Sequence, residues 1–346
     1  MEQLMQWKKA VFPDLLEKMA QRYNVLYTIS LHEPVGRRAI VDRLRLPERL
    51  IRNELDTLQQ LGLVSSSTKG MLMTAEGKDA IIQLHDYVRQ LSGLTMLEQH
   101  LQEKLSLKKV IVVAGNSDED MFVKQEIGRA AVHYLQTIIH EDVSIAVTGG
   151  TTMAAIAEAM VPFDTYRCLF LPARGGVGEK VENQANMIAA KMAEKEKGTY
   201  RLLHVPDPMS ETLYQSFVNE PSVQETVQLI QKANIVIHGI GQALTMAKRR
   251  QTEDTVINML EEKDALSEAF GYYFDKKGNV VHKVRTIGLQ LEDLTDDKHV
   301  ISVAGGCEKA DAIVSYVQKK KTDVLITDEA AAKEILNINN EILRRK

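Results

Sequence analysis

Two patterns of apolar residues follow one another along the chain, and they predict two kinds of domain. Up to about residue 107, apolar positions recur mostly at helical spacing. Beyond it, short apolar runs alternate with helical patterns, which indicates an α/β domain with a largely parallel sheet and right-handed crossovers. A β-hairpin is expected within it at 272–281. The predicted strands of the sheet are residues 110–114, 143–147, 168–171, 202–205, 235–238, 301–304 and 324–327.

The N-terminal region predicts a winged helix-turn-helix. Ile51, Leu55 and Leu58 recur at helical spacing and define the buried face of its third helix. Apolar residues on both sides of the polar segment 65–70 predict a small hairpin, the wing. The expected helices cover residues 14–31, 37–44 and 48–61.

A further helix is expected after Thr74, whose hydroxyl suits a cap, and the helical pattern continues from about 81 to 105. This segment can link the domains and pair subunits, or it can be a plain surface helix packed on its own domain. The sequence therefore predicts three parts. They are a winged-helix domain at 1–80, a linker or oligomerisation helix at 81–107 and an effector-binding domain at 108–346.

The basic residues of the chain concentrate on the winged helix. The net charge is -4, so a nucleic-acid site must be a local patch. The third helix exposes arginine and asparagine, which pair with guanine and adenine in the major groove, and the second helix and the wing can reach phosphate. We predict DNA contacts from Arg37, Arg38, Arg49, Arg52, Asn53 and Lys69. A solvated charged face or a protein-interaction module remains the alternative.

Glycine-rich segments follow four of the predicted strands, at 148–152, 172–178, 239–241 and 305–309. In open parallel sheets ligands bind beyond the carboxyl ends of the strands. Glycine lets backbone N–H groups approach an anion, and a helix start favours negative charge. Glycine can also serve packing alone, but arginine or lysine follows three of these loops, so a phosphorylated ligand is expected.

Particular side chains complete this predicted pocket. Arg174 can hold phosphate through a forked pair of hydrogen bonds, and Lys309 stands beside a glycine loop at a helix start. Helical stacking on Gly241 favours Arg249 over Arg250 as a ligand group. Glu268 can accept sugar hydroxyls or can be a surface or salt-bridged residue, whereas His238 is expected to be a satisfied core histidine. Neither a dinucleotide fingerprint nor a Walker loop is present.

Composition narrows the class of protein. The 346 residues contain 2 cysteines, far apart and without zinc-site spacing, which favours a reducing, cytoplasmic location. We expect no signal peptide, no membrane span, no metal and no cofactor.

Seven strings resemble the SorC-type family of bacterial sugar-responsive transcriptional repressors, and the resemblance runs the whole length. It implies an N-terminal winged helix, a Rossmann-like sugar-phosphate domain and a homo-oligomer, dimer or tetramer, on double-stranded operator DNA. It also implies repression of a glycolytic operon that includes glyceraldehyde-3-phosphate dehydrogenase, relieved by fructose 1,6-bisphosphate. The strings are residues 34–38, 147–152, 172–176, 198–203, 238–241, 268–274 and 303–306.

The resemblance and the glycine loops together give the predicted effector site. Its residues are Gly149, Gly150, Thr151, Thr152, Arg174, Gly175, Gln184, Arg249, Glu268 and Lys309. The rival hypothesis is a sugar-phosphate isomerase or deaminase with an added N-terminal domain. Deaminases and lactonases that share this fold carry Asp-Gly-His where this chain has Gln242-Ala243-Leu244. The acid and the imidazole that move protons are missing there, so we assign no catalytic residue.

Overall fold

The computed structural model describes residues 7, 10–163, 166–177, 180–207 and 209–338. The chain divides into two units, Met1–Met96 and Leu97–Lys346. No helix within the described ranges has both the length and the apolar character that crossing a membrane requires.

The N-terminal unit is the predicted winged helix. Three helices, α2, α3 and α4, precede a two-stranded antiparallel hairpin, β1–β2, and the Thr74 hydroxyl caps the helix that follows, α5. Ile29, Ile40, Ile51 and Leu58 meet in its core and are fully buried. The bounds are α2 Pro13–His32, α3 Arg37–Leu44, α4 Glu48–Gln60, β1 Val64–Ser67, β2 Gly70–Met73 and α5 Ala75–Ser92.

The predicted continuous helix at 81–105 is wrong at Gly93. This glycine adopts a left-handed conformation, φ 80°, and ends α5, after which α6 (Leu94–Leu105) begins at once. Glycine is the usual residue for such an ending because it has no Cβ to clash. The helical apolar pattern continues across the break, which is why the pattern alone did not reveal it.

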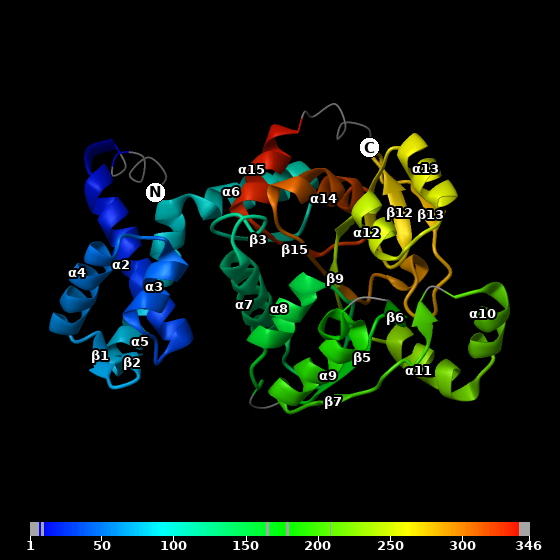
Figure 1. Cartoon of the computed structure of the whole chain (residues 1–346), viewed down its shortest axis with the longest axis horizontal. Helices are drawn as coiled ribbons and strands as arrows, with labels where there is room; N and C mark the ends of the chain where they lie inside the picture. The colour runs from blue at the N-terminus through cyan, green and yellow to red at the C-terminus, as the bar shows by residue number, and fades with distance from the viewer. Residues whose placement is uncertain (1–6, 8–9, 164–165, 178–179, 208, 339–346) are drawn as a thin grey trace. The chain divides into compact units, whose positions relative to one another are not determined.

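A seven-stranded parallel sheet forms the centre of the C-terminal unit, in the order β3-β15-β14-β9-β4-β5-β7 (Figure 1). Apart from the last strand, its members match the predicted strands within a few residues. They are β3 Lys109–Val113, β4 Val143–Val147, β5 Cys168–Pro172, β7 Thr199–Tyr200, β9 Ile235–Gly239, β14 His299–Val303 and β15 Val324–Asp328.

The strand predicted at 202–205 is absent. Leu203 and Val205 are buried, which explains the apolar run. The backbone N–H of Leu203 donates to the side chain of Asn186 on α9, not to a neighbouring strand. Two short strands flank the segment: β7, at the edge of the large sheet, and β8 (Pro206–Asp207), which pairs in parallel with β6 (Gly176–Val177).

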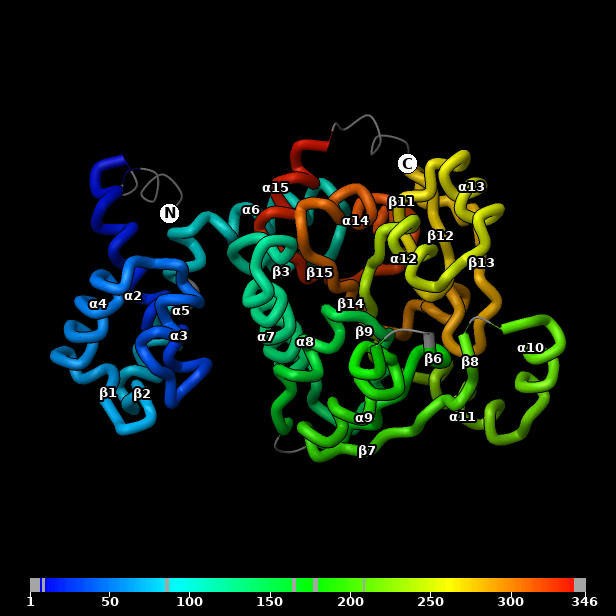
Figure 2. The backbone as a smooth tube through the Cα atoms, in the orientation of Figure 1, coloured from blue at the N-terminus to red at the C-terminus, as the bar shows by residue number. Residues whose placement is uncertain are grey.

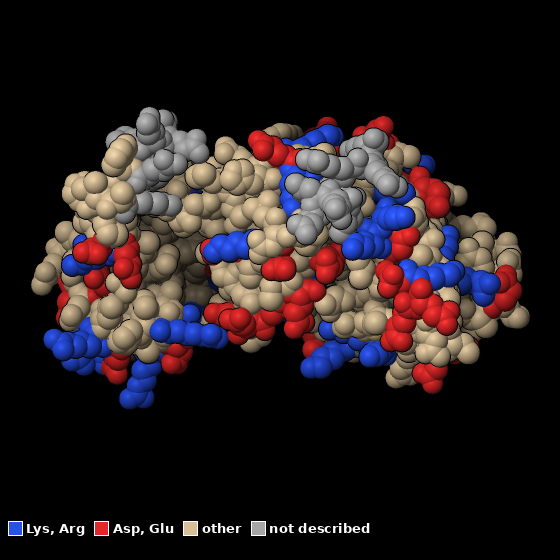
Figure 3. Space-filling view, turned by 90° about the horizontal axis from the view of Figure 1, so that it is seen from above, with Lys and Arg blue, Asp and Glu red and all other residues tan. Residues whose placement is uncertain are grey.

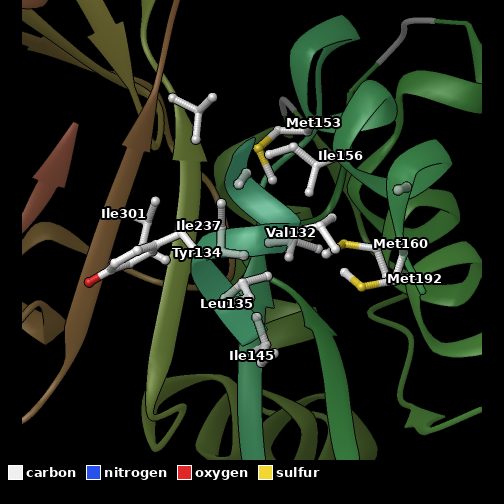
Figure 4. Close-up of a cluster of buried hydrophobic side chains, with 14 of the residues drawn as sticks. Val132, Tyr134, Leu135, Ile145, Met153, Ile156, Met160, Met192, Ile237 and Ile301 are labelled. Carbon is white, nitrogen blue, oxygen red and sulfur yellow. The ribbon is translucent and has the colours of Figure 1, made fainter. Parts of the chain in front are cut away.

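Helices α7 (Met121–Ile138), α8 (Thr151–Ala159) and α9 (Ala185–Glu196) share one core with the large sheet. Figure 4 shows Val132, Leu135 and Ile156 of the helices directed toward one cluster with strand residues such as Ile145 and Ile237. α7 and α8 approach closely at Gly128, where an added Cβ would lie 2.5 Å from a backbone oxygen of α8.

The predicted hairpin is part of a larger antiparallel sheet, β10-β11-β12-β13, whose strands lie next to α12 and α13 in Figures 1 and 2. Because β10 follows β9 almost directly, it places Gly241 opposite Glu268 of β11. This second sheet thereby brings a carboxylate to the carboxyl ends of the large sheet. The strands are β10 Gly241–Gln242, β11 Ala265–Ala269, β12 Tyr272–Asp275 and β13 Val280–Lys283. The remaining helices are α10 Glu211–Val218, α11 Pro221–Gln231, α12 Ala243–Arg249, α13 Asp254–Glu262, α14 Ala310–Val317 and α15 Glu329–Asn337.

Candidate functional site

A pocket opens where the strand order of the large sheet reverses. From β4 the chain continues to β5 and β7 on one side, while β9, β14 and β15 lie on the other. Loops that follow adjacent strands diverge at such a point and leave a crevice. The segments after β4, β5, β9 and β14 all contribute to its lining.

All the predicted effector residues line this one pocket. They are Gly149, Gly150, Thr151, Thr152, Arg174, Gly175, Gln184, Arg249, Glu268 and Lys309. Further lining residues are Thr148, Met153, Asn183, Ala185, Gly239, Ile240, Gly241, Met246, Arg250, Ala269, Phe270 and Val303.

The loop after β4 presents the start of α8 to the pocket. Gly150 has a φ of 118°, which favours glycine, and its N–H donates to the carbonyl of Asn183 at 2.8 Å. A Cβ on Gly149 would lie 2.6 Å from the same carbonyl. No described side chain caps α8, so its first N–H groups are available to an anion.

Four buried charged residues contact one another beside the pocket, and three of them, Arg174, Arg250 and Glu268, line it. Arg174 donates from Nε to Asp207 Oδ2 at 2.6 Å and from Nη2 to the same oxygen. Its Nη1 lies 3.5 Å from Glu268 Oε1, which also accepts from Arg250 Nη2 at 2.6 Å. None of the four is more than 7% exposed. We call this group the buried quartet.

The quartet gives Arg174 partners within the chain that the sequence did not predict. The two donors that would fork onto phosphate are already directed at Asp207. Two arginines and two carboxylates also balance in charge, so the group as a whole adds no net positive charge beside the pocket. Arg174 therefore fixes the shape of the pocket before any anion arrives.

Glu268 is placed to accept a hydrogen bond. Burial alone would raise its pKa, but Arg250 and Arg174 hold the pKa below the ordinary value and keep the carboxylate ionised. Its hydrogen bonds within the described chain, including one from Gly271 N–H, all use Oε1. Oε2 faces Gly241, where an added Cβ would be 3.6 Å away. A sugar hydroxyl can therefore donate to Oε2.

Asp207 is the buried partner of Arg174, and the sequence pattern did not single it out. Burial raises the pKa of its carboxyl more than Arg174 lowers it, and its Oδ1 is buried without a hydrogen-bond partner in the described chain. It is the second residue after the predicted strand at 202–205, a position like those of the loops that were found. The signal existed, but that loop has no glycine to attract attention.

Arg249 and Arg250 both line the pocket, but they differ in exposure and in surroundings. Arg250 is buried and donates from Nη1 to the hydroxyl of Tyr273 at 2.9 Å, in addition to Glu268. Arg249 is exposed at the end of α12 and lines the pocket.

The glycine loop after β14 differs from the prediction. The N–H of Gly306 donates to Asp328 at 2.7 Å, and the N–H of Glu308 donates to Asp118 at 3.1 Å. Carboxylates of the chain thus occupy the place expected for an anion, and only Lys309 extends from this loop to the pocket. The pKa of Lys309 is lowered to about 8, first by burial and then by the positive charges of Lys124 and Arg249.

His238 is a satisfied core histidine, as predicted. It is fully buried, with Nδ1 3.0 Å from the carbonyl of Gly239 and Nε2 2.8 Å from the hydroxyl of Ser302. Burial lowers its pKa to about 4, so it stays neutral at physiological pH. The described residues contain no group of His, Cys, Asp or Glu that could hold a metal ion.

In the N-terminal unit, all the residues predicted to contact DNA are exposed. They are Arg37, Arg38, Arg49, Arg52, Asn53 and Lys69. Arg37 and Arg52 also line a shallow hollow between α4 and the wing, and Arg37 lies 3.2 Å from Glu48. Figure 3 shows lysine and arginine gathered along one edge of this unit, whereas both signs of charge mix over much of the other.

Comparisons with known proteins agree with this division of the chain. A family model described as "CggR N-terminal DNA binding domain" matches residues 18–88, and one described as "Putative sugar-binding domain" matches residues 89–337. The central glycolytic genes regulator of Bacillus subtilis (strain 168) is 47% identical over 337 residues, which cover 97% of this chain and 99% of that protein.

Solved structures extend the likeness to the fold. The crystal structure of a SorC family transcriptional regulator from Enterococcus faecalis is 46% identical with a TM-score of 0.66, covering 70% of this chain and 99% of that one. The full-length sorbitol operon regulator SorC from Klebsiella pneumoniae has a TM-score of 0.64 over 93% of this chain and 99% of its own. At 14% identity, the second comparison concerns the fold alone.

Proposed function

Because the chain belongs to the family of central glycolytic genes regulators, within the SorC-type transcriptional regulators, we propose that it represses a glycolytic operon and responds to fructose 1,6-bisphosphate. It is a sugar-responsive transcriptional repressor with a DNA-binding and a sugar-binding domain, not an enzyme. The operon that we propose includes glyceraldehyde-3-phosphate dehydrogenase.

The observation that supports a phosphorylated effector is the uneven distribution of charge in the pocket. The uncapped start of α8, Arg249 and Lys309 supply positive potential to the pocket. Glu268 Oε2 can accept a hydroxyl, while the buried quartet is neutral overall. A sugar with one phosphate near these cations and hydroxyls near Glu268 matches both features, and the second phosphate of the bisphosphate is proposed from the family alone.

The alternative function, a sugar-phosphate isomerase or deaminase, would need a proton-transferring side chain where this chain has Gln242. Gln242 donates from Nε2 to the carbonyl of Glu308 at 2.7 Å and accepts from the Thr245 hydroxyl. An amide held in this way neither gains nor loses a proton, so it supplies neither the general acid nor the general base that isomerisation or deamination uses.

Relief of repression requires that the effector change the affinity for DNA. We propose that a homo-oligomer, dimer or tetramer, holds several winged helices on operator DNA in the cytoplasm. The effector must bind the DNA-free arrangement more tightly than the DNA-bound one, because a ligand with equal affinity for both shifts nothing. The segment α5–Gly93–α6 joins the two domains and is the place to look for the change.

The test is an operator-binding titration with the full chain at fixed salt, because such affinities depend strongly on salt. Labelled operator DNA is titrated with protein in the presence of fructose 1,6-bisphosphate, fructose 6-phosphate or glucosamine 6-phosphate. We expect the bisphosphate to weaken operator binding most, and operator DNA to weaken effector binding by the same factor. Equal operator affinity with and without the bisphosphate would contradict the proposal, as would turnover of any of these sugar phosphates.

A further inference from the structure

We propose that Lys124, on α7, is a further phosphate-binding residue of the effector pocket, an inference that rests on the proposed function. Its Nζ lies 3.5 Å from the hydroxyl of Thr151. Thr151 is the first residue of α8 and lines the pocket. Lys124 thus reaches the anion-accepting helix start from a neighbouring helix that contributes none of the glycine loops.

Three cations approach one another here, each from a different element: Lys124 from α7, Arg249 from α12 and Lys309 from the turn after β14. Lys124 and Arg249 both lower the pKa of Lys309, which places the three charges within electrostatic reach of one another. Like charges held close together cost free energy unless an anion lies between them.

The nearby carboxylates are engaged elsewhere. Asp118 and Asp328 are the acids that act on Lys309 in the opposite direction. Asp328 Oδ2 accepts from the N–H groups of Ser117 and Gly306, and Asp118 Oδ2 accepts from the N–H of Glu308. Both acids are thus held by backbone N–H groups, and their charges offset only part of the effect that burial, Lys124 and Arg249 have on Lys309, whose pKa remains lowered. A phosphate group has the charge and the number of acceptor oxygens that three cations and a helix start can use.

Calorimetric titration of the full chain with fructose 1,6-bisphosphate at pH 8 tests this role. We expect Lys124→Gln to weaken binding by roughly tenfold to a hundredfold, the usual worth of a hydrogen bond to a charged group. Lys124→Arg keeps the charge and is expected to bind within a few-fold of wild type. The matched control is Lys191→Gln, because Lys191 pairs with Glu158 outside the pocket and its loss should leave binding unchanged.

A second measurement separates a direct charge effect from a structural one. At pH 8 the amine of Lys309 is near half-charged in the free protein, so phosphate binding should take up a proton. Titrations in two buffers of different ionisation enthalpy measure this uptake. In Lys124→Gln, Lys309 loses a positive neighbour and begins more fully charged, so proton uptake should fall.

The outcomes are distinct. A wild-type protein that does not bind the bisphosphate overturns the proposed function and this inference with it. Wild-type binding that Lys124→Gln leaves unchanged overturns the role of Lys124 alone. The same holds if Lys124→Arg binds as weakly as Lys124→Gln, because the charge would then not be the cause.

Discussion

Arginines of the winged helix face solvent, whereas two arginines of the effector domain are buried against carboxylates. Arg38, Arg49 and Arg52 of the winged helix are exposed, and their donors reach solvent. Arg174 and Arg250 of the effector domain are 5% and 7% exposed, and each is paired with a carboxylate. An exposed arginine meets an external phosphate at little cost to folding. A buried one must be neutralised within the chain, because an unpaired buried charge is strongly destabilising.

Within the effector domain, too, buried and less buried cationic residues have different roles. The buried quartet shapes the pocket, and its two arginines hold Glu268 in position. Attraction of an anion is left to Arg249 and Lys309, at less buried positions, and to Lys124 by our inference. A substitution in the quartet should therefore act on folding first, whereas one outside it should act on binding.

The largest effect is expected from Arg174→Ala. It leaves Asp207 buried without its partner, so we expect a loss of roughly 3–5 kcal/mol in the free energy of unfolding, together with the effector response. Denaturant unfolding measures the loss. An exposed pair provides the contrast: Glu158→Gln, which breaks the contacts with Lys191 and Lys195, should cost less than about 1 kcal/mol.

The double variant Arg174→Ala with Asp207→Ala shows where the cost of Arg174→Ala comes from. If the cost of Arg174→Ala comes mainly from the stranded carboxylate, the double variant should be clearly less destabilised than the sum of the single variants. Additive losses would mean that the pair is not coupled and that the quartet is not the unit described above.

Arg52→Ala should show the opposite behaviour. Stability and effector binding should remain close to wild type, while specific operator binding weakens by roughly 1–3 kcal/mol if Arg52 contacts a base edge. Binding to unrelated DNA should fall less, because non-specific affinity comes from phosphate contacts. A full operator affinity in this variant would remove Arg52 from the interface.

Lys309 should give the pocket a pH dependence with opposite signs for binding and for stability. Its pKa is about 8 in the folded protein, below the ordinary 10.5. Above pH 8, effector binding must first charge the amine, so affinity should fall by up to about tenfold per pH unit. Over the same range the unfolded chain holds more protons than the folded one, so this group makes unfolding less favourable as pH rises toward 10.5. Lys309→Met should remove both trends.

Much of this arrangement could be predicted from the sequence. Strand ends followed by glycine and a cation identified the pocket, because parallel strands bring those ends to one edge of a sheet. Helical spacing favoured Arg249 over Arg250 as a ligand group; Arg249 is the exposed one of the two, although both line the pocket. Those inferences needed only the spacing of apolar residues and the rule that the loops after parallel strands lie at one edge of the sheet.

What the sequence could not give are the partners that side chains find across the fold. The bond from Arg174 to Asp207 depends on β8 pairing with β6, and those two-residue strands have no recognisable pattern. Lys124 lies in an ordinary amphipathic helix, and only the packing of α7 against α8 brings it to Thr151. Gly93 ends α5 although the apolar pattern continues beyond it. Apolar periodicity shows which side of a helix is buried, but it does not show where the backbone leaves the helical conformation.

The smallest effect on DNA binding is expected from Lys69→Ala. This variant tests whether the wing contacts DNA, as the exposed arginines are predicted to do. Lys69 lies in the turn between β1 and β2, exposed, where its backbone N–H donates to the hydroxyl of Ser67. If its amine neutralises one phosphate, Lys69→Ala should weaken binding to operator and unrelated DNA alike. The slope of log affinity against log salt should decrease by about 0.9. A change confined to the operator would instead mean that the wing reads sequence, and an unchanged slope would mean that it does not touch DNA.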